Sequence, residues 1–171
     1  LEHAHQSGVS RLLVQSTQPP DWSHLPVQEY LLTDGQLPST FHPNPAVKKV
    51  NYALYPGQML SFRLRANPTQ RLSAGKGNKG KRVGLYKIED QQAWLARKAK
   101  ESGFRIQSAL PLEQNFVEDR LTSDLKFFSV QFDGILQVTD PDKLISAIKC
   151  GIGSGKAFGF GLLSIAPVSS S

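Results

Sequence analysis

The order of the segments from Met59 onward restricts the fold of this chain more than any other feature of its sequence. Over residues 59–68, apolar residues alternate with polar ones, which predicts a strand with one buried face and one open face. Arg63 and Arg65 both fall on the polar face of that strand. The first strand is therefore expected to pack one face on a core and to present two arginines on the other.

The rest of the chain continues as strands and helices. An apolar stripe that ends at Gly103 predicts a helix over 89–102, and Asp140 with Pro141 predicts the start of another, which Gly151 ends. Period-two patterns predict further strands at 83–88, 104–112, 127–138 and 162–166. This β-α-β-β-α-β order, with a hairpin after the first strand, is typical of the ferredoxin-like fold and of the α+β class.

Two such domains are expected in tandem. Residues 58–171 contain the whole pattern, so they are expected to form a C-terminal ferredoxin-like domain with a basic hairpin and a glycine-rich loop. Residues 1–57 offer two or three strands and little helix. They are therefore expected to be the remainder of an N-terminal ferredoxin-like domain.

Positive charge is concentrated in one part of the chain. Twelve basic and three acidic residues lie between Arg63 and Arg105, a net +9, whereas the whole chain carries +6. Such a segment predicts a polyanionic partner, with a solvated basic face as the alternative. No apolar run approaches the roughly 20 residues of a membrane-spanning helix, so no membrane partner is expected. A single cysteine, Cys150, fits a reducing cytoplasm.

The segment 71–82 contains three glycines among its basic residues, which predicts a flexible, positive hairpin that we call the finger. A solvated surface loop is the alternative. The function expected of the finger is to enter a groove or to follow nucleic-acid phosphates, because mobile cations release counterions when they bind. The side chains expected to make these contacts are Lys76, Lys79, Lys81 and Arg82.

A second candidate site is the glycine-rich loop at 151–161, in which five of eleven residues are glycine. The backbone N–H groups of Gly151, Gly153 and Gly155 can approach a phosphate because no Cβ stands in the way. Lys156 adds a positive charge in the middle of the loop. The loop is therefore a candidate phosphate-binding segment.

Two familiar phosphate-binding motifs do not fit this loop. Lys156 stands where the dinucleotide fingerprint needs glycine, and Ala157 stands where the P-loop needs Ser or Thr. A tightly folded turn between a helix and a strand, with Phe158 and Phe160 in the core, explains the glycines equally well. Both interpretations remain open from the sequence alone.

The histidines do not form a catalytic or metal-binding pattern. The chain has four of them, at His3, His5, His24 and His42. His3 and His5 would share one face of a strand, but no carboxylate pattern accompanies them, so solvated or structural histidines are the favoured interpretation. No metal and no cofactor are expected.

Four stretches together resemble one known family: residues 62–68 (FRLRANP), 79–83 (KGKRV), 92–95 (QAWL) and 151–163. In register, they are similar to the CasE subfamily of CRISPR-associated endoribonucleases, the RNA-processing subunit of the type I-E Cascade complex. The glycine-rich C-terminal loop is typical of the wider RAMP superfamily. The resemblance extends over nearly the whole chain.

The resemblance implies tandem ferredoxin-like domains that bind the CRISPR repeat stem-loop. It implies metal-independent cleavage at the 3′ base of the hairpin, in which the neighbouring 2′-hydroxyl attacks and leaves a 2′,3′-cyclic phosphate. Retention of the product alongside other Cascade subunits is also implied. The family's catalytic histidine and tyrosine match no residue of this sequence, so they are expected upstream of Leu1. The N-terminal domain is then expected to lack its first strand and helix, and the chain alone is expected to bind RNA but cleave slowly.

The same resemblance gives roles to the basic residues. Arg63 and Arg65 are expected to contact phosphates from their strand, the finger to lie along the RNA stem, and the loop with Lys156 to hold the backbone near the cut. A-form stems are recognised mostly through phosphates and 2′-hydroxyls, which suits Lys and Arg. The alternative is a non-catalytic RNA-binding subunit of a ribonucleoprotein.

Overall fold

The structure is a computed structural model, and it describes residues 2–3, 10–11, 13–21, 23–24, 47–72, 80–118 and 126–168. The chain divides into two compact units. One unit is residues 13–53, whose described residues contain no helix or strand. The other unit combines residues 1–12 with residues 54–171 and contains all the secondary structure described here.

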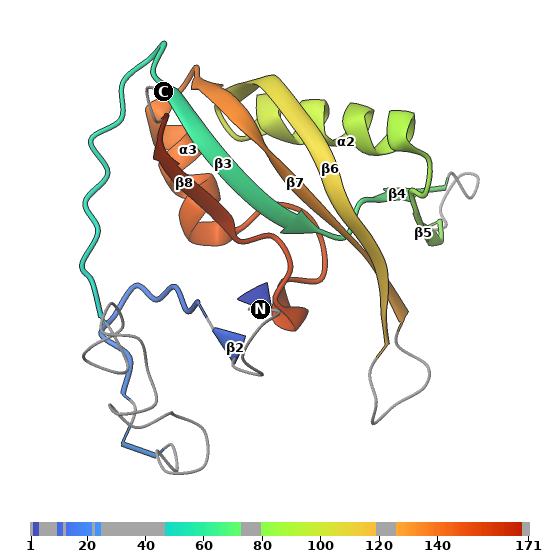
Figure 1. The fold of residues 1–171 in the computed structure, drawn as a ribbon, viewed down its shortest axis with the longest axis horizontal. Helices are drawn as coiled ribbons and strands as arrows, with labels where there is room; N and C mark the ends of the chain where they lie inside the picture. The colour runs from blue at the N-terminus through green and yellow to red at the C-terminus, as the bar shows by residue number, and fades with distance from the viewer. Residues whose placement is uncertain are drawn as a thin grey trace. The chain divides into compact units, whose positions relative to one another are not determined.

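A four-stranded antiparallel sheet forms the centre of the larger unit (Figure 1). Its order is β6-β7-β3-β8, with bounds Phe104–Glu118, Lys126–Val138, Met59–Ala66 and Leu163–Pro167. Helix α2 (Ile88–Glu101) connects the β3 region to β6, and α3 (Pro141–Cys150) connects β7 to β8. The predicted β-α-β-β-α-β order and the α+β class are therefore confirmed.

Four short strands and one helical turn complete the described structure. Strands β4 (Thr69–Arg71) and β5 (Arg82–Gly84) pair antiparallel as the base of the finger. Strands β1 (Glu2–His3) and β2 (Ser10–Arg11) form a separate two-stranded pair. A single 3-10 turn, η3 (Lys156–Phe158), lies inside the glycine-rich loop. Neither helix in the described residues is long and apolar enough to cross a membrane.

The predicted alternation on β3 is confirmed. Leu60, Phe62 and Leu64 are at most 4% exposed, whereas Arg63 is exposed and Arg65 half-buried on the opposite face. Figure 1 shows both helices against one face of the sheet, and that face carries the core. Burial of these large side chains stabilises the unit by roughly 1.5–3 kcal/mol each. The other face is not covered by either described helix.

Helix α2 packs on the sheet through an aromatic contact. Trp94 and Phe132 are both buried, and their rings stack with centroids 6.3 Å apart.

Gln91 is also fully buried, and its amide nitrogen donates to the backbone oxygens of Leu85 and Tyr86. These hydrogen bonds hold the chain segment that turns from β5 into α2. They explain why β5 ends at Gly84 and the helix begins at Ile88, where the sequence predicted a strand.

Helix α3 follows the predicted capping pattern. The backbone N–H of Lys143 donates to Asp140 Oδ1 at 3.1 Å, which satisfies one free donor of the first turn. Pro141 occupies the first turn, and Gly151 ends the helix with φ of 73°. The hydrogen bonds from Lys143 to Asp140 hold the pKa of this carboxyl below its usual value, so the cap stays ionised at neutral pH.

Strand β6 is longer than predicted. It continues to Glu118, paired with Lys126 of β7, where the sequence predicted an end at residue 112. The register shifts twice, between Ile106 and Ser108 and between Pro111 and Glu113. These irregularities obscure the period-two pattern in the sequence, because each shift moves the following side chains to the other face.

Candidate nucleic-acid interface

The finger begins as a regular antiparallel ladder. The N–H of Leu72 donates to Lys81 O at 2.9 Å, and Arg71 lies directly opposite Arg82. Lys81 and Arg82 are consecutive, so their side chains project to opposite faces of this hairpin. Lys76 and Lys79 lie outside the described residues. The base of the finger therefore presents cations on both of its faces.

Arg63 and Arg65 lie on the sheet face that the helices leave uncovered, and both have partners there. Arg63 Nη2 lies 2.7 Å from Asp133 Oδ2, and its Nε donates to the same carboxylate. Arg65 Nη2 donates to Gln131 Oε1 at 3.2 Å. Cross-strand neighbours from β7 thus orient both guanidinium groups, and Asp133 offsets part of the positive charge.

The glycine-rich loop is a tightly packed turn. Gly151, Gly153 and Gly155 all have positive φ. A Cβ at Gly153 would lie 2.9 Å from the ring of Trp94, so glycine allows the loop to pack against α2. Phe160 is buried, as the interpretation of a tightly folded turn requires, whereas Phe158 is 53% exposed and is not part of the core. Phe158 instead lies against Phe127 at the surface, with ring centroids 4.5 Å apart.

Ser154 attaches this loop to the base of the finger. Its hydroxyl donates to Asn67 O at 3.1 Å and lies 3.2 Å from the hydroxyl of Thr69. A β-bridge joins Asn67 and Ser154 through their backbones. The finger, the loop and α2 are consequently held in one arrangement, although they are far apart in the sequence.

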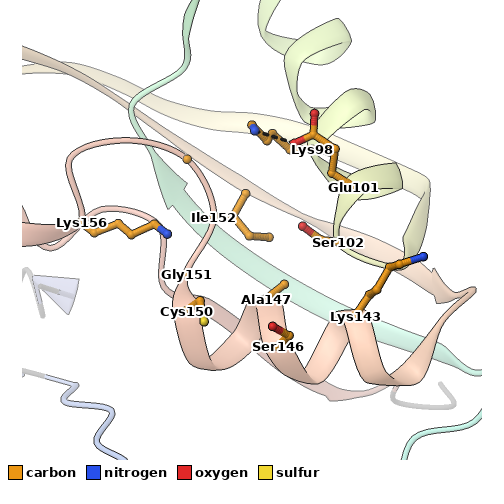
Figure 2. Close-up of a pocket in the computed structure, with 11 residues that line it drawn as sticks. Lys98, Glu101, Ser102, Lys143, Ser146, Ala147, Cys150, Gly151, Ile152 and Lys156 are labelled. Atoms are coloured by element: carbon orange, nitrogen blue, oxygen red, sulfur yellow. Dashed lines mark hydrogen bonds and ion pairs between the residues drawn. The ribbon is translucent and has the colours of Figure 1, made fainter.

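Two pockets lie beside this junction. Figure 2 shows the first, the helix pocket of about 350 Å³, which lies between the last turn of α2, one side of α3 and the glycine-rich loop. Lys98, Lys143 and Lys156 line it. Lys98 pairs with Glu101 at 2.6 Å and Lys143 pairs with Asp140 at 2.9 Å. Within the described structure Lys156 has no ion-pair partner.

The second pocket, the finger-base pocket of about 500 Å³, lies between β4, β5, α2 and the loop. The residues that line it are Thr69, Gln70, Arg71, Arg82, Trp94, Arg97, Lys98, Gly153 and Ser154. Four of these nine are cationic and none is acidic. Since Lys98 and Gly153 line both pockets, the two form a continuous basic strip on the helix side of the unit.

One carboxylate, Glu101, lies at the strip. It accepts hydrogen bonds from Lys98 Nζ at 2.6 Å and Arg97 Nη1 at 3.1 Å. The hydrogen bond from Lys98, followed by the charges of both cations, lowers the pKa of this carboxyl, so it is ionised at neutral pH. All three side chains reach solvent, and such exposed pairs contribute little to stability.

The predicted residues do not all come together. Arg82 and Gly153 meet in the finger-base pocket, and Lys156 lies in the neighbouring helix pocket. Arg63 and Arg65 lie on the opposite face of the sheet, so they belong to a different surface. The structure does not test RNA contacts at any of these positions, which remain predictions.

Sequence interpretation left several residues of the basic strip out of the interface: Thr69, Arg71, Arg97, Lys98 and Ser154. Arg97 and Lys98 follow Trp94 by about one turn of the same helix, so their position beside a buried aromatic was visible in the sequence. Ser154 carried no comparable signal, because its position depends on the loop packing. Among the described residues, no group of three or more metal-binding side chains lies together.

These features define a class of protein: an α+β protein that carries a strip of cationic pockets suited to a polyanion. The chain belongs to the family of CRISPR associated proteins, whose family model matches residues 1–167.

Two curated relatives and one solved structure agree with that assignment. The chain is 39% identical to "CRISPR-associated endoribonuclease Cse3" of Thermus thermophilus over 91% of this chain and 72% of that protein. It is 38% identical to "CRISPR system Cascade subunit CasE" of Escherichia coli over 71% of this chain and 64% of that protein.

The solved structure is of Thermus thermophilus Cse3 bound to an RNA representing a pre-cleavage complex. It matches with a TM-score of 0.64 and 43% identity, over 70% of this chain and 59% of that one. This chain thus spans only part of the length of each of these proteins.

Proposed function

We propose that this protein binds the stem-loop of CRISPR repeat RNA and processes precursor CRISPR RNA as an endoribonuclease. Cleavage would proceed without a metal, by attack of the 2′-hydroxyl to give a 2′,3′-cyclic phosphate. The protein would then remain in the cytoplasm with its product as a subunit of Cascade. Support comes from the family, from the names of its relatives, and from the basic strip on this chain.

The proposal extends to the fold. The strand order β6-β7-β3-β8, with the helices of a β-α-β-β-α-β chain on one face, matches a ferredoxin-like domain. We assign residues 58–171 to that domain. We further assign residues 1–57 to a second domain of the same kind.

The residues of this chain would act by holding the RNA. Phosphodiester cleavage through the 2′-hydroxyl needs a group that accepts a proton and another that protonates the leaving 5′-oxygen. We assign neither role to a residue of this chain. The cations at Arg63, Arg65, Arg82 and Lys156 would instead contact phosphates and offset their charge. The candidate backbone contacts are the N–H groups of Gly151, Gly153 and Gly155.

Base stacking on the sheet, the usual mode of RRM modules, is not part of this proposal. Phe132 is fully buried beneath α2, and Phe128 is half-buried against Tyr86, with ring centroids 4.9 Å apart. Both point away from the open face of the sheet. Contacts to phosphates and 2′-hydroxyls are therefore favoured over stacking of unpaired bases.

A salt titration of hairpin binding tests the proposal. We expect the chain to bind a repeat hairpin in fluorescence anisotropy, with log affinity that falls by about 0.7–0.9 per log salt for each phosphate contact. Three or more contacts would give a slope steeper than about −2. A scrambled, unstructured RNA of equal length is the control, and equal affinity for both would contradict recognition of the stem.

The same samples separate the two functional alternatives. Incubation with excess protein in EDTA, followed by analysis of product ends, should reveal a 2′,3′-cyclic phosphate if the chain cleaves. Tight binding with an intact hairpin would favour the non-catalytic RNA-binding subunit for this chain. Cleavage that EDTA abolishes would contradict the metal-independent mechanism.

A further inference from the structure

We propose that the finger-base pocket is a phosphate subsite that takes one phosphodiester of an RNA backbone, held by Arg71, Arg82 and Arg97. This inference rests on the RNA-binding function proposed above. It adds a location for one phosphate, and it adds Arg71 and Arg97 as contacts beside Arg82.

Arg71 and Arg82 stand directly opposite each other in the β4–β5 ladder. The hydrogen bond from Leu72 N to Lys81 O makes the neighbouring pair the hydrogen-bonded one, so the two arginines form the closer, non-hydrogen-bonded pair. Like charges in directly opposite positions destabilise a two-stranded ladder. An anion between the two guanidinium groups would reverse that repulsion.

No acid in the described structure compensates this pair. Arg71 makes a hydrogen bond to Gly80 O at 3.5 Å, and Arg82 has no ion-pair partner among the described residues. Glu101 pairs with Arg97 and Lys98 on α2, not with the finger. No carboxylate lines the pocket, and Glu101 beside it pairs with only two of its four cations, so the pocket keeps a positive charge, as an anion-binding site requires.

The pocket also has the chemistry that a phosphate oxygen needs. Arginine presents a planar fork of N–H donors that matches phosphate geometry. The hydroxyls of Thr69 and Ser154 lie in the same wall, 3.2 Å apart. Trp94 is 3% exposed and forms an apolar part of the wall, and such a low-dielectric surface beside the cations strengthens their attraction for an anion.

A strand of RNA fits this location better than a free anion. The pocket is open and, at about 500 Å³, far larger than one phosphate group. It shares Lys98 and Gly153 with the helix pocket, where Lys156 lies. A backbone that leaves the finger could therefore place one phosphate between the arginines and continue toward Lys156.

Charge substitutions on α2 test the subsite with a matched control. Arg97→Gln should weaken hairpin binding about five- to eightfold at 0.1 M monovalent salt and reduce the salt slope by about 0.7–0.9, the effect of one phosphate contact. Lys100→Gln removes the same charge from an exposed position of the same helix, outside both pockets, and should stay within about twofold of the wild type. Arg71→Gln should behave like Arg97→Gln.

Glu101→Gln separates binding from a structural role of the ion pair. If Arg97 acts on RNA, Glu101→Gln should raise hairpin affinity, because a carboxylate next to the phosphate is removed. If Arg97 only supports α2 through Glu101, both variants should lower affinity and the unfolding midpoint together. That second outcome would overturn the subsite.

The subsite can fail in these experiments without the proposed RNA-binding function failing. If the wild-type chain binds the hairpin with a steep salt dependence, and Arg97→Gln and Arg71→Gln bind with the same affinity and slope, the subsite is wrong and the proposed function stands. A wild-type chain that does not bind the hairpin at all contradicts both. If inorganic phosphate stabilises the wild type but not Arg97→Gln, while their hairpin affinities agree, the pocket takes a small anion and the strand subsite is wrong.

Discussion

Replacement of Lys79, Lys81 and Arg82 by alanine together is expected to weaken hairpin binding about 100- to 500-fold at 0.1 M monovalent salt. Each lost phosphate contact removes about 0.7–0.9 from the salt slope, so the slope should flatten by about 2.1–2.7. The side chains of Lys81 and Arg82 project from opposite faces of the finger, so the variant removes expected RNA contacts on both faces. The measurement is anisotropy over a series of salt concentrations.

A second triple variant controls for total charge. Lys48, Lys100 and Lys149 are exposed and line neither pocket, so their replacement by alanine removes three charges from other surfaces. This control should lower affinity only slightly, through long-range attraction that salt screens. Equal losses in the two triple variants would show that net charge, not the finger, determines binding.

Gly161→Ala is expected to destabilise the protein by about 3 kcal/mol, through a left-handed backbone and a close contact together. Gly161 has φ of 89°, and a Cβ there would lie 2.5 Å from Ile152 O. The backbone cannot easily move away, because Ile152 N donates to Gly161 O at 2.8 Å and Gly161 N donates to Arg65 O at 2.7 Å. A chain of this size should then lose about 6–12 °C in Tm.

Gly159→Ala is the matched control in the same loop. Gly159 has φ of 82°, and a Cβ there would meet no atom within 4 Å. It should therefore lose only the left-handed preference, about 1 kcal/mol or 2–4 °C. Thermal unfolding of the two variants isolates the close contact as their difference. Equal losses would contradict the tight packing of Gly161 against Ile152.

Local signals in the sequence predicted the framework of the larger unit. The alternation on β3 identified Leu60, Phe62 and Leu64 as core, since period two reports directly which face is buried. Asp140 and Gly151 fixed both ends of α3, because caps act within one turn of their helix. Features of this kind depend on neighbours in the chain, so the residues alone were sufficient.

Features that depend on distant residues were not predictable in this way. The end of β6 depends on its pairing with β7 through two register shifts, so the predicted end at residue 112 was too early. The finger-base pocket requires Arg71, Arg97 and Ser154 to meet, and nothing in their spacing indicates that they do. Glycine at position 153 is explained equally well by phosphate binding and by loop packing. Only the position of Trp94 in the structure shows that packing requires it.

The attachment of Ser154 to Asn67 has a consequence for how the protein acquires its function. These residues are 87 positions apart, so the loss of chain entropy on closing this long loop opposes the contact until other interactions offset it. The cationic strip cannot form in a nascent fragment that ends before the glycine-rich loop, because Gly153, Ser154 and Lys156 follow all its other residues in the chain. Competence to hold RNA should accordingly appear only after this loop has docked against the base of the finger.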